Sequence, residues 1–265
     1  SSNFCCCINI TSFEIPPSVI SIGDYAFTHC SSLKCVKIKS FIESIERFTF
    51  FSCTSLTSIN ILPSVKYIGS NAFNQCSSLE YITIPSSVTR IGDRAFYRCS
   101  SLKSIVISSS YIYIGYLAFD VCSSLKNVEI LSFKAYIGNY AFINCPSLVY
   151  IKILSHLLFL GIEPFSNNSS IENIFIPFTL DQFLENCPNV DLSNTKYIND
   201  CFFPESLSHP KIEPLSMSND LLNCSSYISN VPNENAQIIG NKAFTFISHE
   251  KIEIFSSPLD PEYQY

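Results

Sequence analysis

The chain has 265 residues, of which 47% are hydrophobic, and it carries a formal net charge of −6. The hydrophobic fraction is high enough for a continuous core, whereas the acidic balance disfavours nucleic acid and anionic lipid as general ligands, since both select basic surfaces. No segment reaches the roughly 20 consecutive apolar residues that a membrane-spanning helix needs, so we expect no membrane insertion.

One short motif recurs along the chain with a period of 23 residues. Every glycine follows an isoleucine or a leucine, and the first six stand on one lattice, whose single vacant position is filled by Glu46: Gly23, Gly69, Gly92, Gly115, Gly138 and Gly161. A phenylalanine follows each lattice position by four residues: Phe27, Phe50, Phe73, Phe96, Phe119, Phe142 and Phe165, with Phe4 one period earlier. A fixed period of this length is typical of a stacked solenoid.

The segment that closes each repeat predicts one β-strand. It reads Leu-x-x-Ile-x-Ile, as in Leu102, Ile105 and Ile107, and this alternation has the period of a strand with one buried face. Each strand should pair in parallel with its copy 23 residues later. The pattern therefore predicts a parallel β-sheet along one face of the solenoid.

The other segments of the repeat predict how the chain turns. Glycine at the lattice position predicts either a positive φ or a close approach between the backbones of adjacent coils. The Pro-x-Ser-Val segment, as at 85–88, turns the chain after the strand. The Ala-Phe-x-x-Cys segment is short enough for one helical or 3₁₀ turn opposite the sheet. The predicted fold class is an α/β-type solenoid of 23-residue coils.

Cysteines form a second regular column, three residues after the phenylalanines. Beyond Cys7, its members are Cys30, Cys53, Cys76, Cys99, Cys122 and Cys145. Their spacing favours buried thiols that pack as small hydrophobic groups. Disulfides between coils and metal ligation are disfavoured, because stacking brings cysteines near one another without turning their Cβ vectors together. Cys5 and Cys6 remain ambiguous.

Residues between the buried strand positions must point outward and line the face of the sheet. Most of them are short and polar. The aromatic, apolar and basic members are our candidates for contact with a protein ligand: Tyr81, Tyr150, Phe175, Val106, Lys37 and Lys152. Exposed aromatic side chains are enriched in protein contacts, and the competing interpretation for each residue is an ordinary solvated strand position.

The repeat degrades towards the C-terminus. Asn168 replaces the column cysteine, and the next Cys-Pro pair, at Cys187, shows that the period has slipped by four residues. We therefore expect a solenoid over residues 1–178, a degenerate repeat over 179–190, an irregular insertion over 191–237, a partial capping repeat over 238–257 and a tail over 258–265. Because the chain has no initial methionine and enters the repeat partway through at Phe4, we expect it to be a piece of a longer protein.

No catalytic or cofactor motif is present in the sequence. Consecutive lattice glycines are at least 23 residues apart, which excludes Gly-rich phosphate loops. Cys187, Cys201, His209 and Cys224 could ligate zinc, form a disulfide or stay as thiols, but their spacing matches no compact zinc module. We expect no enzyme activity, no cofactor and no metal. Sequons for N-glycosylation occur at four positions: Asn9, Asn167, Asn168 and Asn223.

The repeat resembles the BspA-like leucine-rich repeat family. The resemblance rests on Ile-Gly-Asp-Arg-Ala-Phe-Tyr-Arg-Cys-Ser-Ser-Leu-Lys-Ser-Ile-Val-Ile at 91–107 and on its six neighbours, and it covers about residues 4–178. It implies a leucine-rich repeat fold and a cell-surface or secreted antigen or adhesin that binds host or other cell-surface proteins. The alternative is an intracellular, cytoplasmic scaffold for protein–protein interaction, which the many unpaired cysteines favour. The oligomeric state is not predicted.

Overall fold

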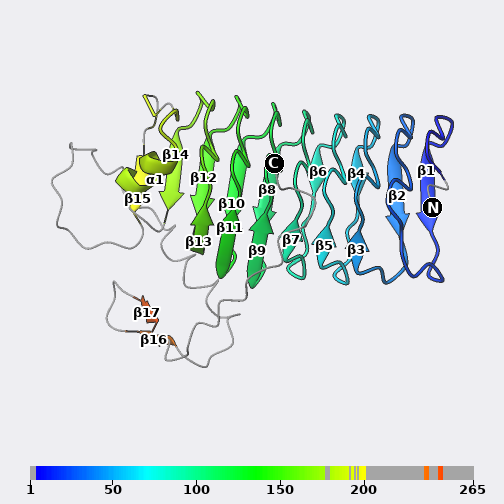
Figure 1. Ribbon diagram of the computed structural model, residues 1–265, viewed down its shortest axis with the longest axis horizontal. Coiled ribbons are helices and arrows are strands. Elements are labelled where there is room, and N and C mark those ends of the chain that lie inside the picture. Colours follow the sequence, from blue (N-terminus) through cyan, green and yellow to red (C-terminus); the bar gives the residue numbers. More distant parts are fainter. Residues whose placement is uncertain are drawn as a thin grey trace, which may run out of the picture. The chain divides into compact units, whose positions relative to one another are not determined.

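The computed structural model describes residues 4–176, 180–190, 192, 193, 195, 197–200, 236–238 and 244–246. The chain divides into two compact units, Ser1–Ile212 and Glu213–Tyr265. The first unit is a row of stacked coils, in which each turn of the chain repeats the path of the turn before it (Figure 1). In the second unit, β16 (Ala236–Ile238) pairs antiparallel with β17 (Phe244–Phe246).

One strand of each coil lies on the predicted sheet face. These strands are β1 (Ser12–Ile15), β2 (Cys35–Ile38), β4 (Ser58–Ile59), β6 (Tyr81–Ile82), β8 (Ser104–Ile107), β10 (Asn127–Ile130), β12 (Tyr150–Ile153), β14 (Asn173–Ile176) and β15 (Tyr197–Asp200). They pair in parallel as β1-β2-β4-β6 and β8-β10-β12-β14-β15, and β6 and β8 are neighbours. Cys35 lies opposite Ser58, so the predicted pairing of residues 23 apart is confirmed. We call this surface the first sheet face.

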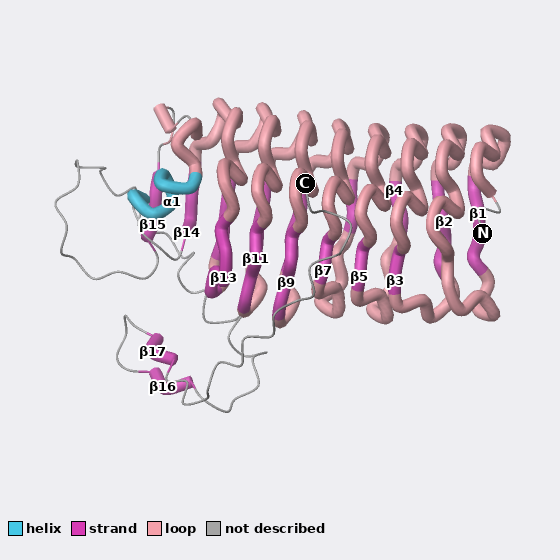
Figure 2. The backbone as a smooth tube through the Cα atoms, in the orientation of Figure 1, coloured by secondary structure: helices cyan, strands magenta, loops and turns pink. Residues whose placement is uncertain are grey.

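A second parallel sheet, which the sequence did not lead us to expect, runs along another side of the coils. Its strands are β3 (Ser44–Ile45), β5 (Tyr67–Ile68), β7 (Arg90–Ile91), β9 (Tyr111–Ile114), β11 (Lys134–Ile137) and β13 (His156–Leu160). From Gly69 on, the isoleucine or leucine before each lattice glycine is the last residue of a strand of this sheet, and Ile45 holds the same place before Glu46. Ile22, before Gly23, lies outside the sheet. β13 carries an irregularity opposite the Ala135–Tyr136 step of β11. In Figure 2 this row of magenta strands lies below that of the first sheet.

The Ala-Phe-x-x-Cys segment does not form the predicted helical or 3₁₀ turn. In the segment 92–99, Ala95 N–H donates to the Gly92 carbonyl oxygen of the same coil (3.2 Å). Phe96 N–H donates instead to the Ala118 carbonyl oxygen of the next coil (2.7 Å). Arg94 and Arg98 have φ values of 52° and 58°. Two left-handed residues in five end any helix. The segment is a series of tight turns that alternately bond within and between coils.

The lattice glycines serve close approach of the backbones and not positive φ. None of Gly69, Gly92, Gly115, Gly138 and Gly161 lies in the left-handed region. A Cβ at Gly92 would lie 2.5 Å from the Ser70 backbone nitrogen and 2.8 Å from the Gly69 carbonyl carbon. Coils stacked this closely leave no room for a side chain at that position.

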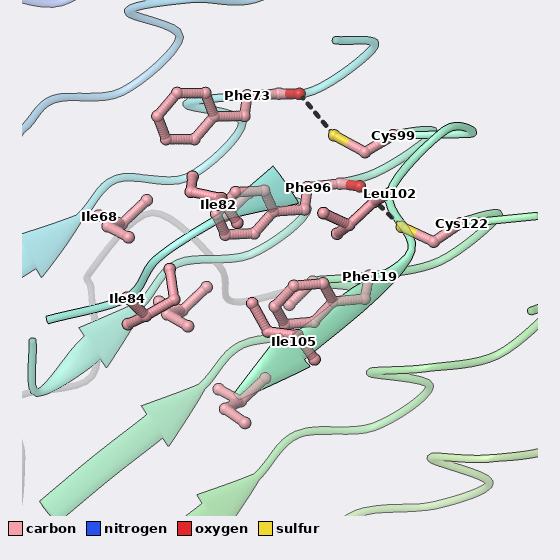
Figure 3. Packing of buried hydrophobic residues seen from close by; sticks show 14 of the residues in the cluster. Ile68, Phe73, Ile82, Ile84, Phe96, Cys99, Leu102, Ile105, Phe119 and Cys122 are labelled. Carbon is pink, nitrogen blue, oxygen red and sulfur yellow. Dashed lines mark hydrogen bonds between the residues drawn. The ribbon is translucent and has the colours of Figure 1, made fainter. Parts of the chain in front are cut away.

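The core is a column of stacked phenylalanine rings enclosed by aliphatic strand residues. From Phe27 to Phe165 the rings are at most 2% exposed, and neighbouring ring centroids lie 4.9 to 5.3 Å apart. Figure 3 shows Phe73, Phe96 and Phe119 in this column, beside Ile82, Ile105 and Leu102. Buried aromatic rings remove large apolar areas from water, so the column holds each coil to the next.

At the C-terminal end of the described coils, the phenylalanine core continues, but a helix contributes to it. Helix α1 (Leu180–Asn186) follows β14, and its Phe183 ring stacks on Phe165 at 6.0 Å. Cys187 is fully buried. Strand β15 pairs in parallel with β14, although β15 lies within residues 191–237, for which we expected an irregular insertion. Cys201, His209, Cys224, the sequon at Asn223, Ile239–Ala243 of the expected capping repeat and the tail 258–265 lie outside the described residues.

Candidate protein-binding surface

The outward residues of the first sheet face differ in how far they reach into solvent. Tyr81 is 58% exposed and Val106 is 46% exposed, and Lys37 is exposed as well. Tyr150, Lys152 and Phe175 are half-buried. All six point outward because they alternate with buried isoleucines or valines on their strands, as in the pattern exposed-buried of β6.

A shallow groove of about 570 Å³ lies on the first sheet face between the second and fourth coils. It contains two of the predicted residues, Lys37 and Tyr81. Its other outward members carry short side chains: Cys35, Ser58, Asn60 and Thr83. These short groups leave a depression between the longer Lys37 and Tyr81 side chains, so an apolar or aromatic group of a ligand can lie on the strands there.

The Tyr81 side chain is held at the edge of this groove by the next coil. Lys103 Nζ donates to the Tyr81 hydroxyl oxygen at 3.2 Å and lies 4.9 Å from the ring centroid. Lys103 also pairs with Glu80, and the bonds to Glu80 and Tyr81 raise the pKa of the lysine. A ring with few remaining rotamers loses little entropy when a ligand packs against it.

Tyr150 and Phe175 form a separate aromatic group three coils away from Tyr81. Their ring centroids are 5.4 Å apart with a tilt of 47°. Lys152 lies opposite Phe175 in the pairing of β12 with β14. The structure therefore splits the six candidates between the groove (Lys37, Tyr81), the central Val106 and this C-terminal group.

A further outward row, on the second sheet, was missed. Arg90 lies 4.4 Å from the Tyr113 ring centroid, Tyr113 stacks on Tyr136 at 4.6 Å, and Tyr136 stacks on Phe159 at 4.4 Å. Tyr67 lies opposite Arg90 in the same register. We call Tyr67, Arg90, Tyr113, Tyr136 and Phe159 the second-sheet row. Its members precede the repeated isoleucine or leucine at 23-residue intervals, so the row was readable in the sequence.

The column cysteines are hydrogen-bonded thiols inside the core. From Cys30 to Cys145, each donates its S–H to the carbonyl oxygen of the phenylalanine 26 residues earlier, at 3.0 to 3.3 Å. Figure 3 shows Cys99 with Phe73 and Cys122 with Phe96. Burial raises the pKa of Cys53 and Cys145 to about 12. A thiol that stays protonated is a poor nucleophile and a poor metal ligand.

Asn168 and Cys187 continue this column. Asn168 Nδ2 donates to the Phe142 carbonyl oxygen at 3.0 Å, at the same spacing of 26 residues, and Cys145 N–H donates to Asn168 Oδ1 at 2.7 Å. Cys187 bonds the Phe165 carbonyl, 22 residues earlier, as the slip of four residues requires. Asn168 is 1% exposed, so its sequon is closed to a glycan, whereas Asn9 and Asn167 are exposed.

Within the part of the chain that the structure describes, no group of three His, Cys, Asp or Glu side chains is close enough to hold a metal ion. No described helix is both long and apolar enough to cross a membrane. The surface chemistry consists of aromatic rings, amides, hydroxyls and a few charges, which suits non-covalent contact with another molecule.

Comparison with known proteins identifies the repeat. The model of the BspA type leucine rich repeat region, in six copies, matches residues 1–119 and 89–209. The chain therefore belongs to the BspA-type leucine-rich repeat family. Its resemblance to this family is thus confirmed, together with a solenoid of parallel strands in coils of about 23 residues. No curated protein gives a significant match.

Three solved structures are similar. A leucine-rich repeat protein of T. pallidum is 26% identical, with a TM-score of 0.59 over 67% of this chain and 83% of that one. A leucine-rich cell surface protein of Faecalibacterium prausnitzii is 28% identical, with a TM-score of 0.40 over 64% and 62% of the two chains. The pneumococcal vaccine antigen PcpA is 19% identical, with a TM-score of 0.37 over 62% of this chain and 50% of that one.

Proposed function

We propose that this chain is a non-catalytic recognition module of a cell-surface or secreted adhesin or antigen. It binds a host or cell-surface protein through the first sheet face. The observation that carries the proposal is the groove between Lys37 and Tyr81, in which a strongly exposed aromatic ring stands beside short polar side chains. Tyrosine is frequent among the residues that dominate binding energy at protein interfaces, because its ring is apolar and its hydroxyl can form a hydrogen bond.

Membership of the BspA-type family supports this proposal, since the family contains surface antigens and adhesins. We assign the binding module to the coils of residues 1–178, with the degenerate repeat 179–190 at their end. The proposal includes no catalysis, because burial raises the pKa of the column thiols from Cys30 to Cys145 and so disfavours the reactive thiolate.

An intracellular scaffold is the second candidate, and one observation favours it. The described column thiols are free, as a reducing compartment keeps them. Their deep burial weakens this argument, because an oxidant or a partner thiol cannot reach them.

The experiment combines location and binding. An antibody to this chain should stain intact source cells, and the purified protein should bind host-cell or matrix protein weakly as a monomer and more strongly when clustered. Tyr81→Ala with Tyr150→Ala should weaken that binding without unfolding the chain. Tyr25→Ala with Tyr140→Ala, on the turn side, is the matched control. Staining only after permeabilisation would contradict the surface assignment, and equal loss in both double variants would contradict the first sheet face.

A further inference from the structure

Three of the four arginines of the chain lie within a single coil. They are Arg90, Arg94 and Arg98, and the fourth is Arg47. Arg90 lies on β7 of the second sheet, and the other two lie in the tight turns that follow. The strip that they form runs across the coil, from the second sheet onto the turn side, and not along the solenoid.

Each of these guanidinium groups lies beside a tyrosine ring. The distances to the ring centroids are 4.4 Å from Arg90 to Tyr113, 5.2 Å from Arg94 to Tyr116 and 5.2 Å from Arg98 to Tyr97. Arg94 and Tyr116 are also joined through their backbones, since Arg94 N–H donates to the Tyr116 carbonyl oxygen at 2.9 Å. We call Arg90, Arg94, Arg98, Tyr97, Tyr113 and Tyr116 the arginine–tyrosine strip.

The three guanidinium groups form no ion pair with a carboxylate of the described residues. Lysines elsewhere on the coils do so: Lys39 pairs with Glu14, Lys66 with Glu43 and Lys103 with Glu80. Cation–π contacts fix the direction of the arginine side chains but leave their N–H donors free for a planar anion.

The two nearest carboxylates are already engaged by amide groups. Asp93 Oδ1 accepts from Tyr116 N–H at 2.9 Å. Asp120 is 6% exposed and accepts from Asn144 Nδ2 at 2.9 Å. Arg94 and Arg98 lower the pKa of Asp120, but burial is the larger effect and raises it. Arg94 and Arg98 are exposed and Arg90 is half-buried, and none of the three forms an ion pair or side-chain hydrogen bond with a carboxylate of the described residues.

We infer that the arginine–tyrosine strip is a second docking surface, which binds an acidic segment of a partner protein. Each guanidinium can hold a carboxylate in two parallel hydrogen bonds, and the tyrosine rings can pack apolar or aromatic side chains next to those carboxylates. Arginine and tyrosine are the residue types that dominate the energy of protein interfaces.

Charge distribution favours a protein segment over a long polyanion. Nucleic acids and sulfated polysaccharides carry charge along their whole length, and their binding surfaces track that length with basic residues. Here the basic strip is confined to one coil of a chain with a net charge of −6. A short segment with two or three carboxylates matches its size.

The test uses the full chain and a labelled peptide that repeats Glu-Tyr-Glu-Gly, with Gln-Tyr-Gln-Gly as the neutral counterpart. Arg90→Gln, Arg94→Gln and Arg98→Gln together should weaken binding of the acidic peptide by at least about tenfold, since charge-assisted hydrogen bonds are lost. The control is Lys34→Gln, Lys39→Gln and Lys66→Gln, which removes the same charge from exposed positions outside the strip and outside the groove, and it should change binding less than about twofold. Urea unfolding curves verify that both variants are folded.

Three outcomes would overturn the inference. The acidic and neutral peptides bind equally or not at all; the lysine variant loses as much affinity as the arginine variant; or a heparin fragment or a single-stranded oligonucleotide binds more tightly than the acidic peptide. Tyr81→Ala with Tyr150→Ala should leave peptide binding unchanged. The strip is thereby tested independently of the first sheet face.

Discussion

At the scale of single residues, two positions of every coil are constrained most strongly. The column phenylalanine packs its ring on the rings of both neighbouring coils, and its carbonyl oxygen accepts a thiol or amide hydrogen from inside the core. The column residue that donates is small: it is cysteine in most coils and asparagine at 168. An aliphatic residue there would remove one of two hydrogen bonds to the carbonyl, which also accepts the backbone N–H of the cysteine three residues later, as from Cys99 to Phe96 at 3.1 Å.

The ring column predicts a large difference between adjacent residues. Phe96→Ala should lower the free energy of unfolding by about 3–5 kcal/mol, because it opens a cavity between Phe73 and Phe119. Tyr97→Ala should cost much less, since Tyr97 is half-buried and outside the column. Cys99→Ala should fall between them. Urea unfolding of the three variants measures this order, and equal losses for Phe96 and Tyr97 would contradict the assigned core.

Left-handed residues predict a stabilising substitution. Val121 has a φ of 58°, a conformation that a β-branched residue adopts only with strain. Val121→Asn should raise the free energy of unfolding by about 1 kcal/mol, because asparagine tolerates this region. Its amide would also extend the row in which Asn167 Nδ2 donates to Asn144 Oδ1. Val106→Asn, on an ordinary strand, is the control and should not stabilise. A lower urea midpoint for Val121→Asn would refute the strain argument.

At the scale of elements, the sequence allowed the first sheet to be predicted but not the second. Leu102, Ile105 and Ile107 show an alternating pattern that recurs in most coils, whereas β3, β5 and β7 at the start of the second sheet contain two residues each. Alternation over four residues appears in the second sheet only at β9 and β11. Two residues carry no period. The tight turns were mistaken for a helical turn because most of their left-handed positions hold residues such as Val121 and Arg98. Asparagine, which would have indicated them, stands at Asn71, Asn144 and Asn167 and does not recur in every coil.

The candidate surface was predictable to a similar degree. Alternation along the strands placed Tyr81 and Lys37 on the outward face, but it could not show that short side chains at Ser58 and Asn60 hollow out a groove between them. The arginine–tyrosine strip depends on the second sheet and on contacts between coils. It could not be inferred while that sheet was unknown.

At the scale of the whole unit, each coil contacts only its neighbours. The free energy of unfolding is therefore approximately a sum of contributions from single coils and from the interfaces between adjacent coils. Across the central coils, from β3 to β11, coupling comes from the same sources at each step: ring stacking, adjacent parallel strands on two sides and the thiol to carbonyl bonds. A perturbation that acts on every coil at once should therefore have a far larger effect than one that acts on a single coil.

Alkaline pH is such a perturbation, because it acts on every buried column thiol. Burial raises the pKa of Cys53, Cys145 and Cys187 to about 12, and it also raises the pKa of Cys30, Cys76, Cys99 and Cys122. The folded chain keeps protons that the unfolded chain releases above its ordinary thiol pKa near 9.0. Stability is thus complete below that pH and is lost as the pH rises towards 12.

Each such thiol lowers the free energy of unfolding by up to about 1.4 kcal/mol per pH unit in this window, so together they should unfold the solenoid below pH 12. Urea unfolding under reducing conditions, at pH values from neutral to strongly alkaline, measures the slope. Cys99→Ala with Cys122→Ala removes two of the titrating groups and should make the slope shallower by roughly a quarter, although the double variant starts from a lower stability. A stability that does not change between neutral pH and pH 11, or an unchanged slope in the double variant, would show that the thiols are accessible to solvent and do not titrate as a buried column.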